Sequence, residues 1–395
     1  MRRIVVNGRF FAQQRTGVQR YAAETLCALD RLLGRRPQYL QHTAWQLAIP
    51  HDARELPMLE NFEIHTLQFL RGHLWEQISL AAFARGAYLV NANYSAPLAK
   101  RNQLITVHDA SVRAHPQTFS RGYRLINNLM VTVLAPRVDT VMTVSHFSAN
   151  ELRRHYKLTR DDWVVGREGW EHVRAAPRLD EAAVLRRYGL ASERFLLAVG
   201  SLKAHKNLGL IARALRVLGH QQTLPVAAVG GMDPRVYRGV EAAGDAAMRW
   251  LGFVPDDELQ VLYRHAAWFI FPSVYEGFGL PPLEAMANGC PVLAARAGPT
   301  PEIYGDAVLY FDADDPSSLA WLLRDVTEGR DAPMLREAVR RRAAACLTHQ
   351  RWDANAEILL DRLIAVGAVA VDRESIDAMP HRDAATPLAH SRGRL

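Results

Sequence analysis

The chain has 395 residues, of which 49% are hydrophobic and 23% charged, the balance of a folded globular protein, and this excludes a disordered or fibrous chain. That length predicts two domains of ordinary size, each able to bury a core. The formal charge of +7 predicts a basic surface that favours phosphates, nucleic acid or an anionic membrane face, and charge alone does not choose among the three.

The cysteines and the N-terminus bear on the compartment. Cys27, Cys290 and Cys346 are far apart and lack the spacing of metal ligands, so neither a disulfide framework nor a zinc site is indicated, and the reducing cytoplasm is expected. The start of the chain lacks the apolar core of a signal peptide, and no apolar run approaches the ~20 residues that span a bilayer. Any membrane contact is expected to be peripheral.

Short β-branched runs alternate with helical patterns along the chain, as in repeated βαβ units with parallel sheets. Strands are predicted at residues 4–6, 88–90, 104–107 and 140–144, and then at 195–199, 225–229, 268–271 and 291–294. The predicted fold is α/β, with two Rossmann-like doubly wound lobes facing a cleft. The predicted units are a domain at 1–173, a linker at 174–193, a domain at 194–350, a helix at 351–371 returning to the first lobe, and a disordered tail at 372–395.

In the first half of the chain, four features are candidates for either a binding role or a structural one. Gly17 opens an amphipathic helix, where a glycine either lets the backbone approach a phosphate or makes a simple turn. His108 ends the strand at 104–107, and spacing alone favours a structural histidine and a ligand contact equally. Ser145 is predicted to be a helix N-cap. The basic, amphipathic stretch 121–137 fits an anionic membrane face or a core helix.

The strand at 195–199 runs into Gly200-Ser201-Leu-Lys203-Ala-His-Lys206 and then into a helical pattern. Such an entry aims backbone amides and cations at one point, which suits a diphosphate whose departure needs charge stabilisation. The alternative is a solvated loop with chance lysines. Only four lysines occur in the chain and two lie here, so we expect Lys206 to contact a phosphate.

The most informative segment runs from Phe271 to Gly289. A strand ends before Glu276, glycines follow at Gly277 and Gly279, and a double proline begins a helix that carries Glu284. Open α/β sheets bind ligands at this edge, and acidic side chains there can accept hydrogen bonds from sugar hydroxyls. The alternative is that Glu284 only complements the helix dipole and Glu276 only caps the loop. Taken together, the segment favours a functional site.

Two other signals are explained without a site. Asp312-Ala-Asp314 resembles a divalent-metal motif, but it follows a strand and precedes a helix, so capping accounts for it. Arg340–Arg342 and Arg35-Arg36 lack interleaved aromatic residues, so they are expected to be solvated faces, and nucleic acid is not an expected partner.

The segment 276–292 resembles the pattern EGFGLPxLEAMAxGxPV of the retaining glycosyltransferases of family four, which have the two-lobed GT-B fold. Their mark is a glutamate pair separated by seven residues, the spacing of Glu276 and Glu284. The resemblance implies that Glu284 binds the donor ribose, that Glu276 contacts the transferring sugar, and that the amides of Phe278, Gly279 and Leu280 hold sugar and phosphate.

The resemblance extends over nearly the whole chain. It makes residues 1–173 the acceptor side and 194–350 the nucleotide-sugar-binding domain, with Glu276, Lys206 and His108 as catalytic residues. The donor-binding set it implies is Gly17, Gly200, Ser201, Lys203, Val254, Gly277, Phe278, Gly279, Leu280 and Glu284. The chain departs from the family at Ser201 and His205, where arginine is frequent, which leaves Lys203 as the expected second cation.

The resemblance further implies a front-face reaction in which the leaving phosphate takes the acceptor's proton, without a metal or other cofactor; the nucleotide sugar is a substrate. The segments TGVQRY and VGSLKAHKN are similar to segments of bacterial enzymes of exopolysaccharide or O-antigen synthesis. GDP-mannose is therefore the expected donor and a glycan, in particular a lipid-linked oligosaccharide, the expected acceptor, with the protein at the inner face of the cell membrane. Residues 91–97 are expected to line the acceptor side.

Other functions remain open. A nucleotide-sugar epimerase or a sugar phosphorylase can share the two-lobed fold, although neither is marked by this glutamate motif. A non-catalytic nucleotide-sugar-binding subunit of a transferase complex is a further alternative, against which the intact Glu276, Glu284 and Lys206 argue.

Overall fold

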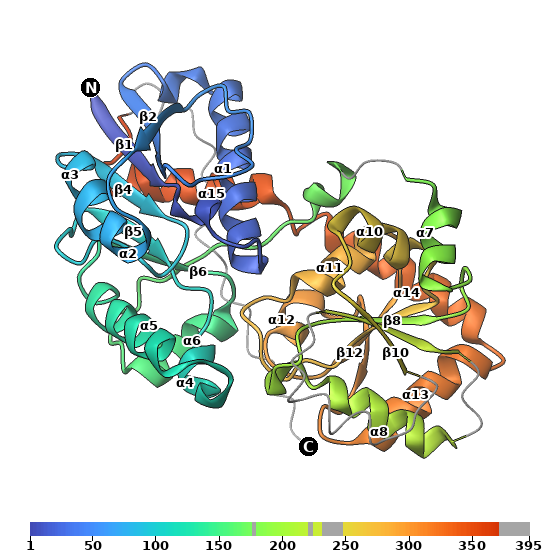
Figure 1. Cartoon of the computed structure of the whole chain (residues 1–395). Coiled ribbons are helices and arrows are strands. Elements are labelled where there is room, and N and C mark those ends of the chain that lie inside the picture. The colour runs from blue at the N-terminus through green and yellow to red at the C-terminus, as the bar shows by residue number, and fades with distance from the viewer. Residues whose placement is uncertain (176–178, 220–223, 231–247, 371–395) are drawn as a thin grey trace.

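The protein, described here from a computed structural model that covers residues 1–175, 179–219, 224–230 and 248–370, is built of two lobes (Figure 1). The N-terminal lobe contains a seven-stranded parallel sheet in the order β3-β2-β1-β4-β5-β6-β7. Its strands are β1 (Arg2–Asn7), β2 (Thr43–Pro50), β3 (Glu63–Leu67), β4 (Tyr88–Asn91), β5 (Gln103–Thr106), β6 (Thr140–Thr143) and β7 (Val164–Val165).

The C-terminal lobe contains a six-stranded parallel sheet in the order β10-β9-β8-β11-β12-β13. Its strands are β8 (Leu196–Val199), β9 (Val226–Val229), β10 (Met248–Gly252), β11 (Trp268–Phe271), β12 (Val292–Ala295) and β13 (Leu309–Phe311). Two parallel sheets covered by helices confirm the predicted α/β class with two doubly wound lobes.

The N-terminal helices are α1 (Gly17–Arg35), α2 (Gly72–Leu74), α3 (Ala81–Phe83), α4 (Ser111–Ala114), α5 (Arg121–Leu134) and α6 (His146–Tyr156). The C-terminal lobe has α8 (Leu208–Leu218), α10 (Asp256–His265), α11 (Leu280–Ala287), α12 (Thr300–Tyr304), α13 (Pro316–Glu328) and α14 (Ala332–Leu347). Helix α7 (Glu181–Tyr188) lies within the range expected to be linker. Helix α15 (Trp352–Ala365) crosses back and packs on α1 (Figure 1), and the expected tail at 372–395 lies outside the described residues.

The cores explain why the strands read as nearly continuous apolar runs, since parallel strands are covered on both faces. In the N-terminal lobe, residues such as Ile4 and Val90 face α1 and α15, while Ile105 and Val141 face α5 and α6. In the C-terminal lobe, α8 and α13 cover one face of the sheet and α10 and α11 the other.

Strands β2, β3, β7 and β10 lie outside the predicted set. The edge strand β3 has only partly buried or exposed residues, and β7 is two residues long, so neither leaves a strong apolar run. Edge strands are covered on fewer sides, and their sequences carry a weaker periodic signal for that reason.

The sheet order places the ligand-binding edges. It reverses between β1 and β4 in one lobe and between β8 and β11 in the other. Open α/β sheets bind ligands outside the carboxyl ends of the strands at such a reversal. In the described ranges, no helix is both long and apolar enough to cross a membrane.

Candidate active site between the lobes

Both lobes line two adjoining cavities, of about 870 Å³ and about 540 Å³. Gly17 and His108 of the N-terminal lobe and Lys206 and Glu276 of the C-terminal lobe line both cavities. The larger one extends over the N-terminal lobe to Tyr123, and the smaller one extends along α11. The structure therefore brings residues from the predicted motifs of both lobes to one cleft.

The loop between β11 and α11 lies in close contact with the N-terminal lobe. A Cβ atom at Gly277 would meet the backbone oxygen of His108 at 2.6 Å, so only glycine allows this approach. The Gly277 carbonyl accepts hydrogen bonds from Ser145 Oγ at 2.7 Å and from Ser148 Oγ at 3.1 Å. Gly279 has φ +105° and begins α11. The two glycines thus serve different needs, close approach and a left-handed turn.

Lys206 and Glu276 form an ion pair in the cleft, with 2.5 Å between Nζ and Oε1. Lys206 ends the short 3-10 turn Ala204–Lys206 after β8. Lys203 lies with Nζ 4.7 Å from the ring centre of Phe119, and burial and the charge of Lys206 lower its pKa. Burial lowers the pKa of His205 to about 4, so its imidazole is neutral near pH 7 and supplies no second cation.

Glu284 lies on α11 at the inner end of the smaller cavity, where its side chain has buried partners. His172 Nε2 is 3.1 Å from Oε1, and the Tyr263 hydroxyl donates to Oε2 at 3.3 Å. Burial alone would raise the pKa of Glu284, but the hydrogen bond from His172 and the charge of Arg20 lower it below its ordinary value. Glu284 is therefore a fixed, ionised acceptor of hydrogen bonds.

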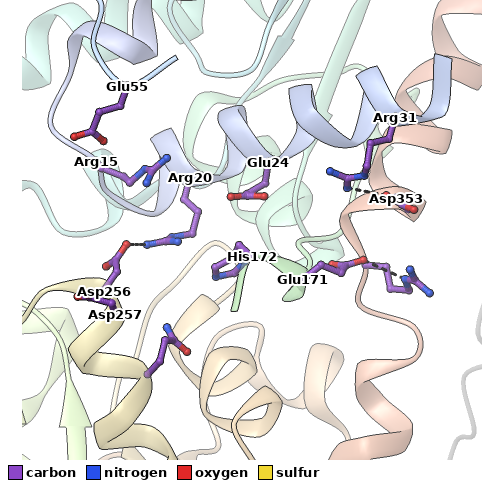
Figure 2. Close-up of a pocket in the computed structure, with 12 residues that line it drawn as sticks. Arg15, Arg20, Glu24, Arg31, Glu55, Glu171, His172, Asp256, Asp257 and Asp353 are labelled. Atoms are coloured by element: carbon purple, nitrogen blue, oxygen red, sulfur yellow. Dashed lines mark hydrogen bonds and ion pairs between the residues drawn. The ribbon is translucent and has the colours of Figure 1, made fainter. Parts of the chain in front are cut away.

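Arg20 reaches from α1 across the cleft to the C-terminal lobe. Its guanidinium pairs with Asp256 at the start of α10, as Figure 2 shows, and its Nε lies 3.9 Å from Glu284 Oε1. Burial opposes the charge of Arg20, but Glu284 and Asp256 outweigh it and leave the pKa raised. One residue of the N-terminal lobe thus contacts two acids of the opposite lobe.

His172 connects Glu284 to the two segments that cross between the lobes. Trp352 Nε1, at the start of α15, lies 3.1 Å from His172 Nδ1. An indole N–H can only donate, so Nδ1 must accept, and the ring proton is on Nε2, which donates to Glu284. The crossings are also joined through Glu171, whose carboxylate accepts from Arg351 Nε at 3.1 Å and from the Trp352 backbone N–H at 3.0 Å. Figure 2 shows His172 and Glu171 below α1.

His108 lies at the carboxyl end of β5, packed edge-on against Tyr21 with 4.7 Å between ring centres. Its Nε2 is 3.4 Å from the carbonyl of Ala92, and its Nδ1 is 3.9 Å from a carboxyl oxygen of Glu168. Burial lowers the pKa of His108. The imidazole is therefore a neutral group at the meeting point of the two cavities.

Of the predicted donor set, Gly200, Ser201 and Lys203 line the larger cavity, and Phe278, Gly279 and Leu280 line the smaller one. The side chain of Val254 is buried in the core, between Phe253 and Pro255, which line the smaller cavity. Tyr94 and Ser95, from the segment expected on the acceptor side, line the larger cavity.

The structural expectations outside the cleft can also be compared. Ser145 is the N-cap of α6, with its side chain accepting from Ser148 N, as predicted. Asp315 caps α13, and Asp312 Oδ1 accepts from Asp314 N at 2.9 Å, so capping and turn formation account for these acids. Helix α5 buries Met130 and Leu134, whereas other apolar residues of the same helix are exposed.

Sequence reasoning missed Arg20, Glu168 and His172. Arg20 lies one helical turn after Gly17, so its direction into the cleft was available from the helical period. Glu168 and His172 lie between β7 and α7, where no strong strand or helix pattern drew attention to them. Their signal was an acid and a histidine beside glycines just before the predicted linker.

Comparisons with known proteins give the family and the solved structures to which this chain is similar. Residues 186–345 match the family described as Glycosyl transferases group 1. Over 236 residues the chain is 28% identical to O-antigen chain mannosyltransferase B of Escherichia coli, and the match covers 58% of this chain and 62% of that protein. The chain thus spans less than two thirds of that relative's length.

Two solved structures share the fold. WaaG, a glycosyltransferase involved in lipopolysaccharide biosynthesis, is 16% identical with a TM-score of 0.64, covering 91% of this chain and 99% of that chain. HepE of Anabaena, in complex with UDP and glucose, is 16% identical with a TM-score of 0.67, covering 92% of this chain and 100% of that chain. At such identity the likeness establishes the architecture. The chain therefore has the two-lobed GT-B architecture, and residues 186–345 in its C-terminal half match the group 1 glycosyl transferases.

Proposed function

We propose that this protein transfers a sugar from a nucleotide diphosphate donor to a glycan acceptor, with retention at the anomeric carbon and without a metal ion. The observation that carries the proposal is the arrangement of Lys206, Glu276 and Glu284 along one cavity, with His108 opposite. A cation, helix amides and hydrogen-bonding carboxylates in one cleft suit a diphosphate, a sugar ring and a ribose.

Lys206 is placed to stabilise the leaving phosphate. An ammonium group has three N–H donors, so Lys206 can keep its bond to Glu276 while it donates to a diphosphate. The backbone amides of Phe278, Gly279 and Leu280, at the entry to α11, add fixed positive dipoles. The bond between the anomeric carbon and the phosphate oxygen breaks, the acceptor oxygen bonds to the same face of that carbon, and the acceptor's proton passes to the leaving phosphate oxygen.

The donor is proposed to be GDP-mannose, because the relative from Escherichia coli is a mannosyltransferase. Glu284 would accept hydrogen bonds from the ribose hydroxyls, and its ionised state suits that role. Lys206 and the amides would supply the counter-charge that a metal ion supplies elsewhere, so no cofactor is proposed.

The acceptor is proposed to be a lipid-linked glycan that binds over the N-terminal lobe, as in O-antigen or exopolysaccharide synthesis at the inner face of the cell membrane. The larger cavity has an aromatic wall, with Phe119 and Tyr123 stacked at 5.5 Å between ring centres. Next to it on α5, Leu125 and Leu129 are exposed beside Arg121 and Arg124. A basic and apolar helix face is suited to a peripheral contact with an anionic membrane.

Donor binding by wild type and Glu284→Ala tests the proposal. Calorimetric titration with GDP-mannose should show binding to the wild type and an affinity at least about tenfold lower in the variant, since a hydrogen bond to a charged group contributes about 1.5–3 kcal/mol. Glu337→Ala, on the exposed surface of α14, is the matched control and should bind as the wild type does. Unchanged affinity in a folded Glu284→Ala protein would remove this residue from the donor site.

A further inference from the structure

Glu168 carries a buried carboxyl group at the smaller cavity. The residue is 5% exposed and lines this cavity together with His108, Glu276 and Glu284. Within the described part of the chain, no hydrogen-bond partner of its carboxyl group is found, and His108 Nδ1 at 3.9 Å is too far for a direct hydrogen bond. A buried polar group normally has a partner, so one with free capacity at a cavity calls for a ligand.

The position of Glu168 is fixed by the glycines on either side. A Cβ atom at Gly166 would meet Asn355 Oδ1 at 2.2 Å, and one at Gly169 would meet the backbone nitrogen of Trp352 at 2.1 Å. Both glycines therefore allow this segment to pack directly against α15. The backbone of Glu168 is therefore held by close packing, and its side chain is presented to the cavity from a rigid support.

Burial raises the pKa of the Glu168 carboxyl well above its ordinary value, and the nearby acids Glu276, Glu284 and Asp109 raise it further. Burial also lowers the pKa of His108. The contact of His108 Nε2 with the Ala92 carbonyl places the ring proton on that nitrogen, which leaves Nδ1 as an acceptor. The facing groups are thus an O–H donor and a nitrogen acceptor, both without charge.

From this geometry we infer that Glu168 is a specificity residue for the transferring sugar: together with His108 it hydrogen-bonds a sugar hydroxyl, beside Glu276 and Glu284, which disfavour sugars that carry a carboxylate. The inference rests on the proposed function and names the class of sugar, a neutral hexose. A hydroxyl both donates and accepts, which matches an uncharged acid beside an uncharged imidazole. A uronic acid would bring a further carboxylate beside Glu276 and the ionised Glu284, which like-charge repulsion opposes.

The test compares Glu168→Leu and Glu168→Gln with wild type, using calorimetric titration with GDP-mannose and with GDP. Glu168→Leu should lose about tenfold in affinity for GDP-mannose, the value of one buried hydrogen bond, and keep its affinity for GDP. Glu168→Gln keeps a donor and an acceptor and should bind both ligands within about threefold of wild type. Glu284→Ala should give a different pattern. Because Glu284 is proposed to bind the ribose, which both ligands contain, this variant should lose affinity for GDP-mannose and for GDP alike.

Equal losses for GDP-mannose and GDP in Glu168→Leu would mean a structural role, and no loss for either would mean no contact; each result overturns the inference. GDP-mannuronate, which differs from GDP-mannose by its carboxylate, should bind wild type at least about tenfold more weakly, since repulsion of one charge is of that order; equal affinity also overturns it. If wild type transfers mannose while the Glu168 variants bind as it does, only this inference fails. If wild type binds neither GDP-mannose nor UDP-glucose, the proposed function fails with it.

Discussion

At the scale of single residues, the site combines charged and uncharged groups that lie close together. Lys206 and Glu276 are ion-paired and Glu284 is held in its ionised form, whereas burial favours the uncharged forms of His108, His205 and Glu168. Burial acts on all of these groups, and the partners decide which of them keep a charge. Glu284 has His172 and Arg20 beside it, while Glu168 has mainly other acids.

Lys206→Ala should lower kcat by on the order of a hundredfold or more, because it removes a preorganised charge from the leaving phosphate. Lys203→Ala should have a smaller effect, because Lys203 lies over the ring of Phe119 and is not paired with Glu276. Steady-state kinetics on both variants, with thermal unfolding as a check on folding, measure this. A larger loss in Lys203→Ala would mean that the phosphate ligand is assigned to the wrong lysine.

Glu168→Gln should stabilise the protein increasingly as the pH rises above about 4.5. The raised pKa means that the folded protein keeps a proton on Glu168 that the unfolded chain releases, so wild-type stability falls with pH from the ordinary value of 4.5 up to the raised pKa. Glutamine does not titrate and avoids this loss. The measurement is the unfolding free energy of both proteins between pH 4.5 and 8, and a difference that does not change with pH would contradict the raised pKa.

At the scale of elements, the two segments that cross between the lobes are connected to Glu284, the residue proposed to bind the donor ribose. The first crossing contributes Glu171 and His172, the second contributes Arg351 and Trp352, and His172 contacts Glu284 directly. Movement of the lobes at these crossings would therefore shift the group that is proposed to hold the ribose. This makes His172 a positioning residue for Glu284.

Trp352→Phe should weaken donor binding by several-fold to tenfold and leave kcat within about threefold, since it removes one hydrogen bond that orients His172. Nitrogen NMR of the wild-type imidazole should show the Nε2-protonated tautomer, and the variant should show a mixture. Trp321→Phe is the matched control because Trp321 is exposed on α13. A wild-type spectrum with the proton on Nδ1 would contradict the proposed connection.

The sequence predicted the helices, strands and site residues whose conformation is determined by their neighbours in the chain. Gly279 begins a helix in a left-handed conformation, and Ser145 caps one, so local rules identify both. Most strands with two covered faces were predicted, although the buried strand β2 was missed, and the edge strand β3 was not predicted because its burial is incomplete. The helical period after Gly17 indicates the direction of Arg20, whereas Glu168 and His172 acquire their importance from residues far along the chain, which no local pattern records.

At the scale of the whole molecule, the lobes are joined by hydrogen bonds between the start of α6 in the N-terminal lobe and residues of the C-terminal lobe. Gly277 accepts from Ser145 and Ser148, and Glu302 accepts from the backbone N–H groups of His146 and Phe147 at 2.8 Å each. Arg20 joins the lobes on the other side. Contacts between the lobes therefore lie on both sides of the proposed reaction centre.

Metal-independent transfer is tested by turnover of GDP-mannose by purified protein dialysed against excess chelator, read as GDP release with and without a lipid-linked glycan acceptor. We expect acceptor-dependent release at nearly the rate seen with magnesium or manganese restored, and at least about a hundredfold less in Lys206→Ala. Loss of activity on chelation with recovery on adding metal would contradict the role of lysine and helix amides. Binding of GDP-mannose without turnover, with or without acceptor, would contradict catalysis itself and favour a nucleotide-sugar-binding subunit.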